Sequence, residues 1–115
     1  MPYLLIQTNV ELPAAKADAL LQAASRLLAE QLGKPEDYVM AGIAPVSRMI
    51  FAGSSEPTAF LSLKSIGLAE GKLKPLSASL CKLLSEHMQI SSDRVYIEFV
   101  NASAKYWGYD SGTFG

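Results

Sequence analysis

The chain starts with a short, very apolar stretch: residues 2–6, directly after Met1, are PYLLI. The three consecutive aliphatic residues from Leu4 to Ile6 indicate a strand over residues 2–8 that is buried on both faces. An initiator methionine before a small residue such as proline is normally removed, and Pro2 would then be a free secondary amine heading a buried strand. Burial disfavours the ammonium form and lowers the pKa of an amine, so Pro2 is a candidate base at neutral pH.

A purely structural role for Pro2 is the alternative. Proline as the start residue at the edge of a strand is well tolerated, because its missing N–H costs nothing there. On the local sequence alone this structural role is the more common one, so the choice depends on the rest of the chain.

The bulk composition is that of one small domain spanning residues 1–115. Half of the residues are hydrophobic and 18% are charged, which favours burial of surface in an oligomer. The net charge of −1, without a basic cluster, argues against a nucleic-acid partner. No apolar run has the ~20 residues of a membrane span, no secretory signal is visible, and the single cysteine favours a reducing, cytoplasmic setting.

Hydrophobic periodicity predicts strands and helices in a repeating order. In the first half we expect a strand over residues 2–8, a helix from Pro13 to about residue 32 that ends at Gly33, and a strand over residues 38–43 that Pro45 interrupts. In the second half we expect a strand over residues 58–66, a loop over 67–75, a helix over 76–88 and a strand over 94–100. Four aromatic residues in the last ten predict that the C-terminal tail docks on this subunit or on a neighbour.

The two halves also match at a constant offset. The helical stripe of the first half aligns with that of the second, and the flanking residues align too: Leu20, Ala24, Leu27, Leu28, Leu32, Glu30, Asp37 and Val39 correspond to Leu76, Leu80, Leu83, Leu84, Met88, Glu86, Asp93 and Val95. We therefore predict an α/β (α+β) fold of two consecutive βαβ repeats with right-handed crossovers. Two helices would cover one face of a four-stranded mixed sheet, and subunit association would cover the other face.

The sequence resembles the macrophage migration inhibitory factor family of the tautomerase superfamily along nearly the whole chain. The most telling stretches are Pro2 behind Met1, residues 7–10 (QTNV), 33–35 (GKP), 53–57 (GSSEP), 65–67 (SIG), 92–97 (SDRVYI) and 111–114 (SGTF). Together these stretches are specific, although no single one would be. The resemblance implies a homotrimer of two-repeat subunits whose pockets lie between adjacent subunits.

The resemblance also implies a function, which we state as an expectation. It implies a keto–enol tautomerase without a cofactor or metal, acting on small phenylpyruvate-like or dopachrome-like substrates, with Pro2 as catalytic base and then acid. Lys34 would bind the substrate carboxylate, although a cation at a helix C-terminus also has a structural explanation. The backbone N–H of Ile66 and, from the adjacent subunit, the Tyr96 hydroxyl would contact the substrate. Apolar walls are expected from Tyr3, Tyr38, Tyr109 and Phe114.

The alternative to an enzyme is a cytokine-like binding or signalling protein with a vestigial pocket, and a related reaction on another unsaturated acid is a third possibility.

Three departures from the family pattern bear on this expectation. Glu98 stands where animal members carry a substrate-contacting asparagine, and a carboxylate there would repel an acidic substrate and favour protonated Pro2. Tyr109 replaces the usual tryptophan while Trp107 lies two residues earlier, and Thr58 and Leu61 replace the two cysteines of the CxxC pair. We expect Cys81 to be a buried structural thiol and His87 to be exposed, and we expect no metal site.

Overall fold

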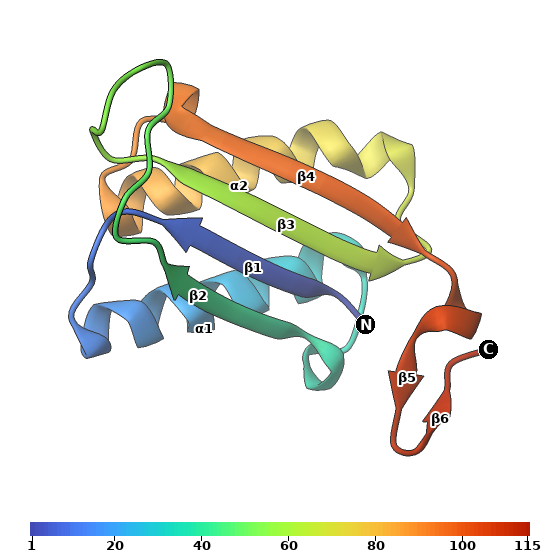
Figure 1. The fold of residues 1–115 in the computed structure, drawn as a ribbon. Coiled ribbons are helices and arrows are strands. Elements are labelled where there is room, and N and C mark those ends of the chain that lie inside the picture. The colour runs from blue at the N-terminus through green and yellow to red at the C-terminus, as the bar shows by residue number, and fades with distance from the viewer.

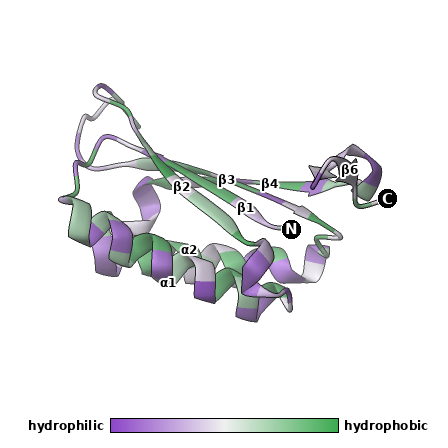
Figure 2. Ribbon diagram, turned by 90° about the horizontal axis from the view of Figure 1, so that it is seen from below, coloured by the Kyte–Doolittle hydropathy of each residue, from purple (hydrophilic) through white to green (hydrophobic).

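A computed structural model of residues 1–115 has two helices packed against one face of a four-stranded sheet (Figure 1). Seen edge-on, both helices lie on the same side of the sheet and no element covers the other side (Figure 2). None of its helices has the length and apolarity needed to cross a bilayer. The main elements are β1 (Tyr3–Thr8), α1 (Ala14–Leu32), β2 (Met40–Pro45), β3 (Ala59–Ile66), α2 (Leu73–Met88) and β4 (Val95–Ala102).

The strand order β2-β1-β3-β4 confirms the predicted pair of βαβ repeats. Within each repeat the strands are parallel, β1 with β2 and β3 with β4. The two repeats join where β1 pairs with β3 in antiparallel register, and this makes the sheet mixed as predicted. The homotrimer stays a prediction.

Pro2 is the residue immediately before β1, which is an interior strand of the sheet. β1 lies between β2 and β3, and Pro2 itself is buried. Its carbonyl accepts a hydrogen bond from the Met40 N–H at 3.0 Å. Proline is tolerated here because it comes before the first ladder residue, where no N–H donor is needed.

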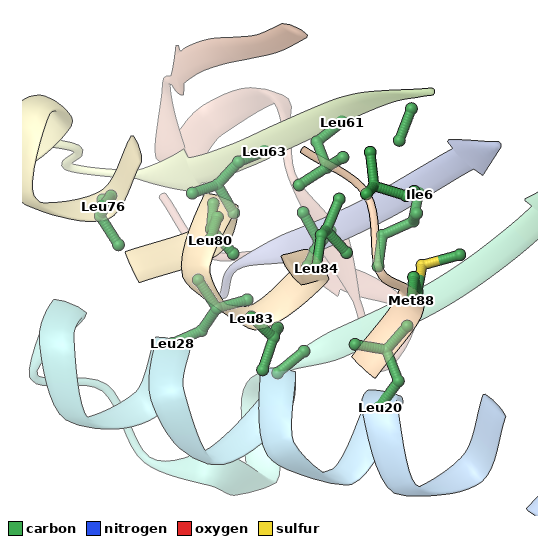
Figure 3. Close-up of a cluster of buried hydrophobic side chains, with 14 of the residues drawn as sticks. Ile6, Leu20, Leu28, Leu61, Leu63, Leu76, Leu80, Leu83, Leu84 and Met88 are labelled. Atoms are coloured by element: carbon green, nitrogen blue, oxygen red, sulfur yellow. The ribbon is translucent and has the colours of Figure 1, made fainter. Parts of the chain in front are cut away.

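The hydrophobic core lies between the sheet and the two helices (Figure 3). Alternate residues of β1 and β3 point toward the helices and are fully buried, among them Leu4, Ile6, Leu61 and Leu63. The facing residues come from the predicted helical stripes and include Leu20, Ala24, Leu28, Leu32, Leu76, Leu80, Leu83, Leu84 and Met88. On the uncovered face β1 is only half-buried, so the predicted burial of this strand on both faces is not present within one chain.

Several element boundaries differ from the expected ones. Tyr38 ends a 3₁₀ turn (Glu36–Tyr38) instead of opening a strand, and β2 runs through Pro45, which an edge strand allows. The helix α2 begins at Leu73, within the predicted loop. Pro75 is tolerated there because it lies in the first turn of the helix, where the missing N–H is not needed. Gly33 ends α1 in the left-handed conformation (φ +63°), as predicted.

The C-terminal tail forms a small hairpin that the periodicity did not predict. Its strands are β5 (Gly108–Tyr109) and β6 (Gly112–Thr113). The two connecting residues, Asp110 and Ser111, both have positive φ (48° and 66°), as in a type I′ turn. The polar sequence Asp110-Ser111-Gly112 was the signal from which this turn could have been predicted. This hairpin carries aromatic side chains toward the start of β1.

We expect Leu84→Ala to lower the free energy of unfolding by about 2–5 kcal/mol, because Leu84 is completely buried between the helices and the sheet and its truncation leaves a cavity. Urea denaturation at a fixed protein concentration measures the effect. Lys82→Ala, on an exposed position of the same helix, is the control and should change stability by no more than about 0.5 kcal/mol. Equal effects of the two changes would contradict the assignment of the core.

Candidate functional site

A cavity of about 450 Å³ lies at the start of β1. Its lining is mostly apolar and comes from four separate parts of the chain: the N-terminus, the segment after α1, β3 and the C-terminal tail. The lining residues are Met1, Pro2, Tyr3, Asp37, Tyr38, Val39, Met40, Lys64, Trp107, Gly108, Tyr109 and Phe114. Five residues proposed from the sequence, Pro2, Tyr3, Tyr38, Tyr109 and Phe114, are therefore neighbours in space.

Three aromatic rings form one wall of this cavity. Tyr109 and Phe114, on the two sides of the hairpin turn, are stacked with ring centroids 5.2 Å apart. Tyr38 meets both rings edge-on, at 5.6 Å from Tyr109 and 5.9 Å from Phe114. Offset and edge-to-face contacts of this kind stabilise a rigid wall. The wall also explains how the aromatic tail docks: it packs on its own chain at the turn that precedes β2.

The N-terminal amine is electrostatically unusual. Burial lowers the pKa of the Met1 amino group, and the nearby Lys34 ammonium lowers it further. Both effects disfavour the protonated form. An amine at this end of β1 is thus kept closer to its neutral, basic form than an ordinary chain terminus.

Lys34 reaches this region because of how α1 ends. The left-handed Gly33 turns the chain, and the Lys34 N–H donates to the Ala29 carbonyl at 3.0 Å. Lys34 does not itself line the cavity. Its effect on the N-terminal amine is the evidence that its charge lies close to the site.

Besides Lys34, three residues proposed from the sequence lie outside the cavity. Ile66 is half-buried at the end of β3. Tyr96 packs on Phe51, with ring centroids 4.6 Å apart, and lines a second apolar cavity of about 560 Å³. Glu98 is exposed on β4, the outer strand on the far side of β3 from β1.

The strand register explains why Tyr96 is far from Pro2. Tyr96 pairs with Phe60, and Phe60 pairs with Gln7 near the opposite end of β1. From Tyr3 to Gln7 is four residues, roughly 13 Å along the strand at ~3.3 Å per residue, and β4 lies two strands away, roughly 10 Å in the perpendicular direction across the sheet. The Tyr96 and Pro2 of one chain therefore lie near opposite ends of the sheet and line different cavities.

Comparison with known proteins identifies the family. The family model described as macrophage migration inhibitory factor (MIF) matches residues 1–115. This chain belongs to the MIF family.

Relatives of full length agree with this assignment. The chain is 40% identical to a macrophage migration inhibitory factor homolog from Brugia malayi over 116 residues, covering 100% of both chains. It is 37% identical to the macrophage migration inhibitory factor of Rattus norvegicus, covering 99% of each. Among solved structures, the macrophage migration inhibitory factor homologue from Prochlorococcus marinus has a TM-score of 0.93 and 39% identity, covering 98% of this chain and 99% of that one.

Two charged residues line the cavity of this MIF-family chain without having been proposed from the sequence. Asp37 belongs to the 3₁₀ turn after α1, and Lys64 lies on β3 directly across from Tyr3. The alternation of β3 could have indicated that Lys64 points away from the core. Its position next to Pro2 depends on the pairing of β1 with β3, which periodicity does not specify.

Arg94 has a structural role that the sequence pattern did not predict. Its guanidinium donates hydrogen bonds of 2.9–3.1 Å to the carbonyls of Phe51, Ser54, Glu56 and Pro57. The planar guanidinium has five donors and suits such a cluster of acceptors. Arg94 therefore holds the segment between the two repeats beside Tyr96.

The remaining titratable groups suggest no second reactive centre. No cluster of three His, Cys, Asp or Glu side chains has the arrangement of a metal site. Cys81 is half-buried, and burial raises the pKa of its thiol, so the reactive thiolate is disfavoured. His87 is half-buried rather than exposed as expected, because it lies on the flank of α2. Thr58, at a position of the absent CxxC pair, is buried and donates to the Arg94 carbonyl at 2.7 Å.

We expect Lys34→Met to raise the pKa of the N-terminal amine, because it removes the nearby positive charge that opposes protonation. The pKa should stay below its ordinary range of about 7.7–8.0, since burial is the larger cause and is unchanged. The pH dependence of the N-terminal NMR signals measures it. Lys16→Met, at an exposed position of α1, should leave the pKa unchanged, and an equal pKa in all three proteins would contradict the role of Lys34.

Proposed function

We propose that this chain is a cofactor-free keto–enol tautomerase of phenylpyruvate-like, and also dopachrome-like, substrates, with Pro2 as the base and then the acid. The observation that carries the proposal is the position of Pro2: it is buried, it lines a cavity walled by aromatic rings, and burial and the Lys34 charge lower the pKa of the amine at this end of the chain. MIF-family membership supports the same assignment.

The chemistry needs Pro2 to be the chain terminus. While Met1 is attached, the Pro2 nitrogen is an amide and has no basic lone pair. Once Met1 is removed, the neutral secondary amine takes the proton of the enol hydroxyl, and the resulting ammonium returns a proton to the adjacent carbon, which forms the C–H bond of the keto product. One group tuned near the working pH can perform both transfers.

The other groups around Pro2 have distinct roles in this proposal. The Lys34 ammonium binds the substrate carboxylate and favours neutral Pro2. The backbone N–H of Ile66 hydrogen-bonds the substrate at the end of β3. The rings of Tyr3, Tyr38, Tyr109 and Phe114 hold the aryl group, since such a wall favours stacked and edge-on contacts.

We further propose that the working form is a homotrimer in which the neighbouring subunit supplies Tyr96 and Glu98. The sheet has one face without a covering layer, and Tyr96 is 61% exposed although it is a large aromatic residue. The register separates it from Pro2 of its own chain. Association of subunits would cover the open face and bring the Tyr96 of one chain to the Pro2 cavity of the next.

The first test is conversion of phenylpyruvate enol to the keto form, followed by ultraviolet absorbance. Protein whose mass confirms that it starts at Pro2 should exceed the buffer rate. The same chain with Met1 retained should lose about 10²–10⁴-fold in rate, the usual contribution of a positioned acid–base group. The pair differs only at the N-terminus, so the fold is controlled.

Equal rates in these two proteins would overturn the assignment of Pro2 as the base. Absence of turnover in the protein that starts at Pro2 would favour the alternative of a binding or signalling protein with a vestigial pocket. That alternative has its own support, because the curated relatives are named for inhibition of macrophage migration. Slow phenylpyruvate turnover that still requires a free Pro2 would indicate another unsaturated acid as the substrate.

We expect Glu98→Asn to raise kcat/KM for phenylpyruvate, by roughly three- to tenfold. The change removes a carboxylate that would repel the substrate anion and stabilise protonated Pro2, effects worth about 1 kcal/mol at a partly exposed site. Glu86→Gln, on the exposed surface of α2, is the matched control. An unchanged or lower kcat/KM in Glu98→Asn would contradict the proposed position of Glu98 at a neighbour's cavity.

A further inference from the structure

Tyr96, on β4, packs against Phe51 from the segment between β2 and β3. The two ring centroids are 4.6 Å apart, at an interplanar angle of 41°. The Arg94 guanidinium carbon lies 5.5 Å from the centroid of the Phe51 ring, within the range of a cation–π contact. Phe51 thus links the residue before β4 to the exposed ring on β4.

Arg94 also holds the backbone that carries Phe51. Its guanidinium donates to the Phe51 carbonyl at 3.1 Å and to the Ser54 carbonyl at 3.0 Å, and hydrogen bonds from a charged donor are stronger than neutral ones. Phe51 and Ser54 exchange two backbone hydrogen bonds of 2.9 and 3.0 Å, which close the turn between them. The ring and the backbone of Phe51 are therefore in contact with the same arginine.

The turn that Arg94 holds contains a strained residue. Ala52 has a φ of +53°, and the following Gly53 has a φ of +73°. Glycine adopts positive φ freely, whereas the Cβ of an alanine there lies too close to the following carbonyl oxygen. Strained backbone persists only where neighbouring contacts enforce it, and it is concentrated at functional sites. The turn therefore favours a function of Phe51 beyond filling space.

The Tyr96 ring lies on the face of the sheet that the helices do not cover. Its strand neighbours Val95 and Ile97 pack against the core, so Tyr96 points to the open face, and it is 61% exposed. An unsupported tyrosine occupies several rotamers, and ordering such a side chain when a ligand binds reduces the affinity. Contact with Phe51 orders the ring before a ligand arrives.

We propose that Phe51, held by Arg94, positions Tyr96 at the substrate cavity of the neighbouring subunit. This inference rests on the proposed function, in which association of subunits brings Tyr96 to that cavity. Phe51 and Arg94 are positioning residues, because they act on a bound substrate through the Tyr96 hydroxyl. The proposed function also brings the Glu98 carboxylate to the same cavity, and exchange of the neutral Phe51 leaves the charges of Glu98 and Arg94 in place.

A double-mutant cycle on ligand binding tests the positioning without catalysis. The probe is 3-phenylpropanoate, a carboxylate with an aryl group and no enol. Quenching of Trp107 fluorescence measures its dissociation constant, because this single tryptophan lines the cavity. Four proteins that start at Pro2 are compared: the wild type, Phe51→Leu, Tyr96→Phe and the double variant. Light scattering confirms that all four have the same oligomer mass.

We expect Phe51→Leu to weaken binding about fivefold in the wild-type background, as for one side chain that must be ordered on binding. In the Tyr96→Phe background the same change should have an effect below about twofold, the usual error of additivity, because the hydroxyl that Phe51 positions is absent. A loss of packing alone would affect both backgrounds equally, since Tyr96→Phe keeps the ring.

Two single variants complete the experiment. Arg94→Lys keeps the positive charge but loses the planar fork that binds several carbonyls, so it should weaken binding as Phe51→Leu does. Ile50→Val, at a 76% exposed position of the cavity that Phe51 also lines, should not change binding.

Equal effects of Phe51→Leu in the two backgrounds, or no effect in either, would overturn the proposal, as would a wild-type protein that is monomeric. Wild-type affinity in Arg94→Lys would overturn the role of Arg94.

This test is separable from that of the proposed function. If phenylpyruvate is not converted but the coupling between Phe51 and Tyr96 is observed, the positioning stands and the tautomerase assignment fails. If phenylpyruvate is converted and the coupling is absent, the reverse holds. In the active protein, Phe51→Leu should lower kcat/KM for phenylpyruvate about fivefold, and only while Tyr96 is present.

Discussion

The antiparallel pairing of β1 with β3 is the constraint on which the rest of the structure depends. Each βαβ repeat can bury only one face of two strands, and this pairing joins the two half-sheets over a common core that contains Leu4, Ile6, Leu61 and Leu63. It also makes β1 an interior strand. Pro2, immediately before β1, is therefore buried at the start of an interior strand, and burial disfavours the charged form of an amine placed there.

The two ends of this pairing have opposite characters. At one end, polar groups are satisfied by a set of hydrogen bonds: Thr8 donates to the Thr58 carbonyl at 2.8 Å, Thr58 donates to the Arg94 carbonyl, and Arg94 binds the connecting segment. Buried hydroxyls need such partners to be stable. At the other end, beside Pro2, a cavity is lined mostly by apolar side chains.

The cavity combines residues that are far apart in the sequence. The N-terminus supplies the amine, the turn after α1 supplies Tyr38, and the last residues supply Tyr109 and Phe114. A rigid aromatic wall can hold a flat apolar group, but by itself it does not select among acids. Selection depends on charge, and the chain places Lys34 near the amine and Lys64 on the cavity lining.

The sequence by itself determined the helices, their buried stripes, the twofold repeat and the aromatic residues around Pro2. These follow from local periodicity and from a family resemblance over the whole chain. Only the tertiary structure decided that β1 is interior, that Lys64 and Asp37 line the cavity, and that Tyr96 and Glu98 lie away from it. Strand order and register were beyond periodicity because alternation shows which face a residue occupies, whereas the neighbouring strand is chosen by contacts between distant segments.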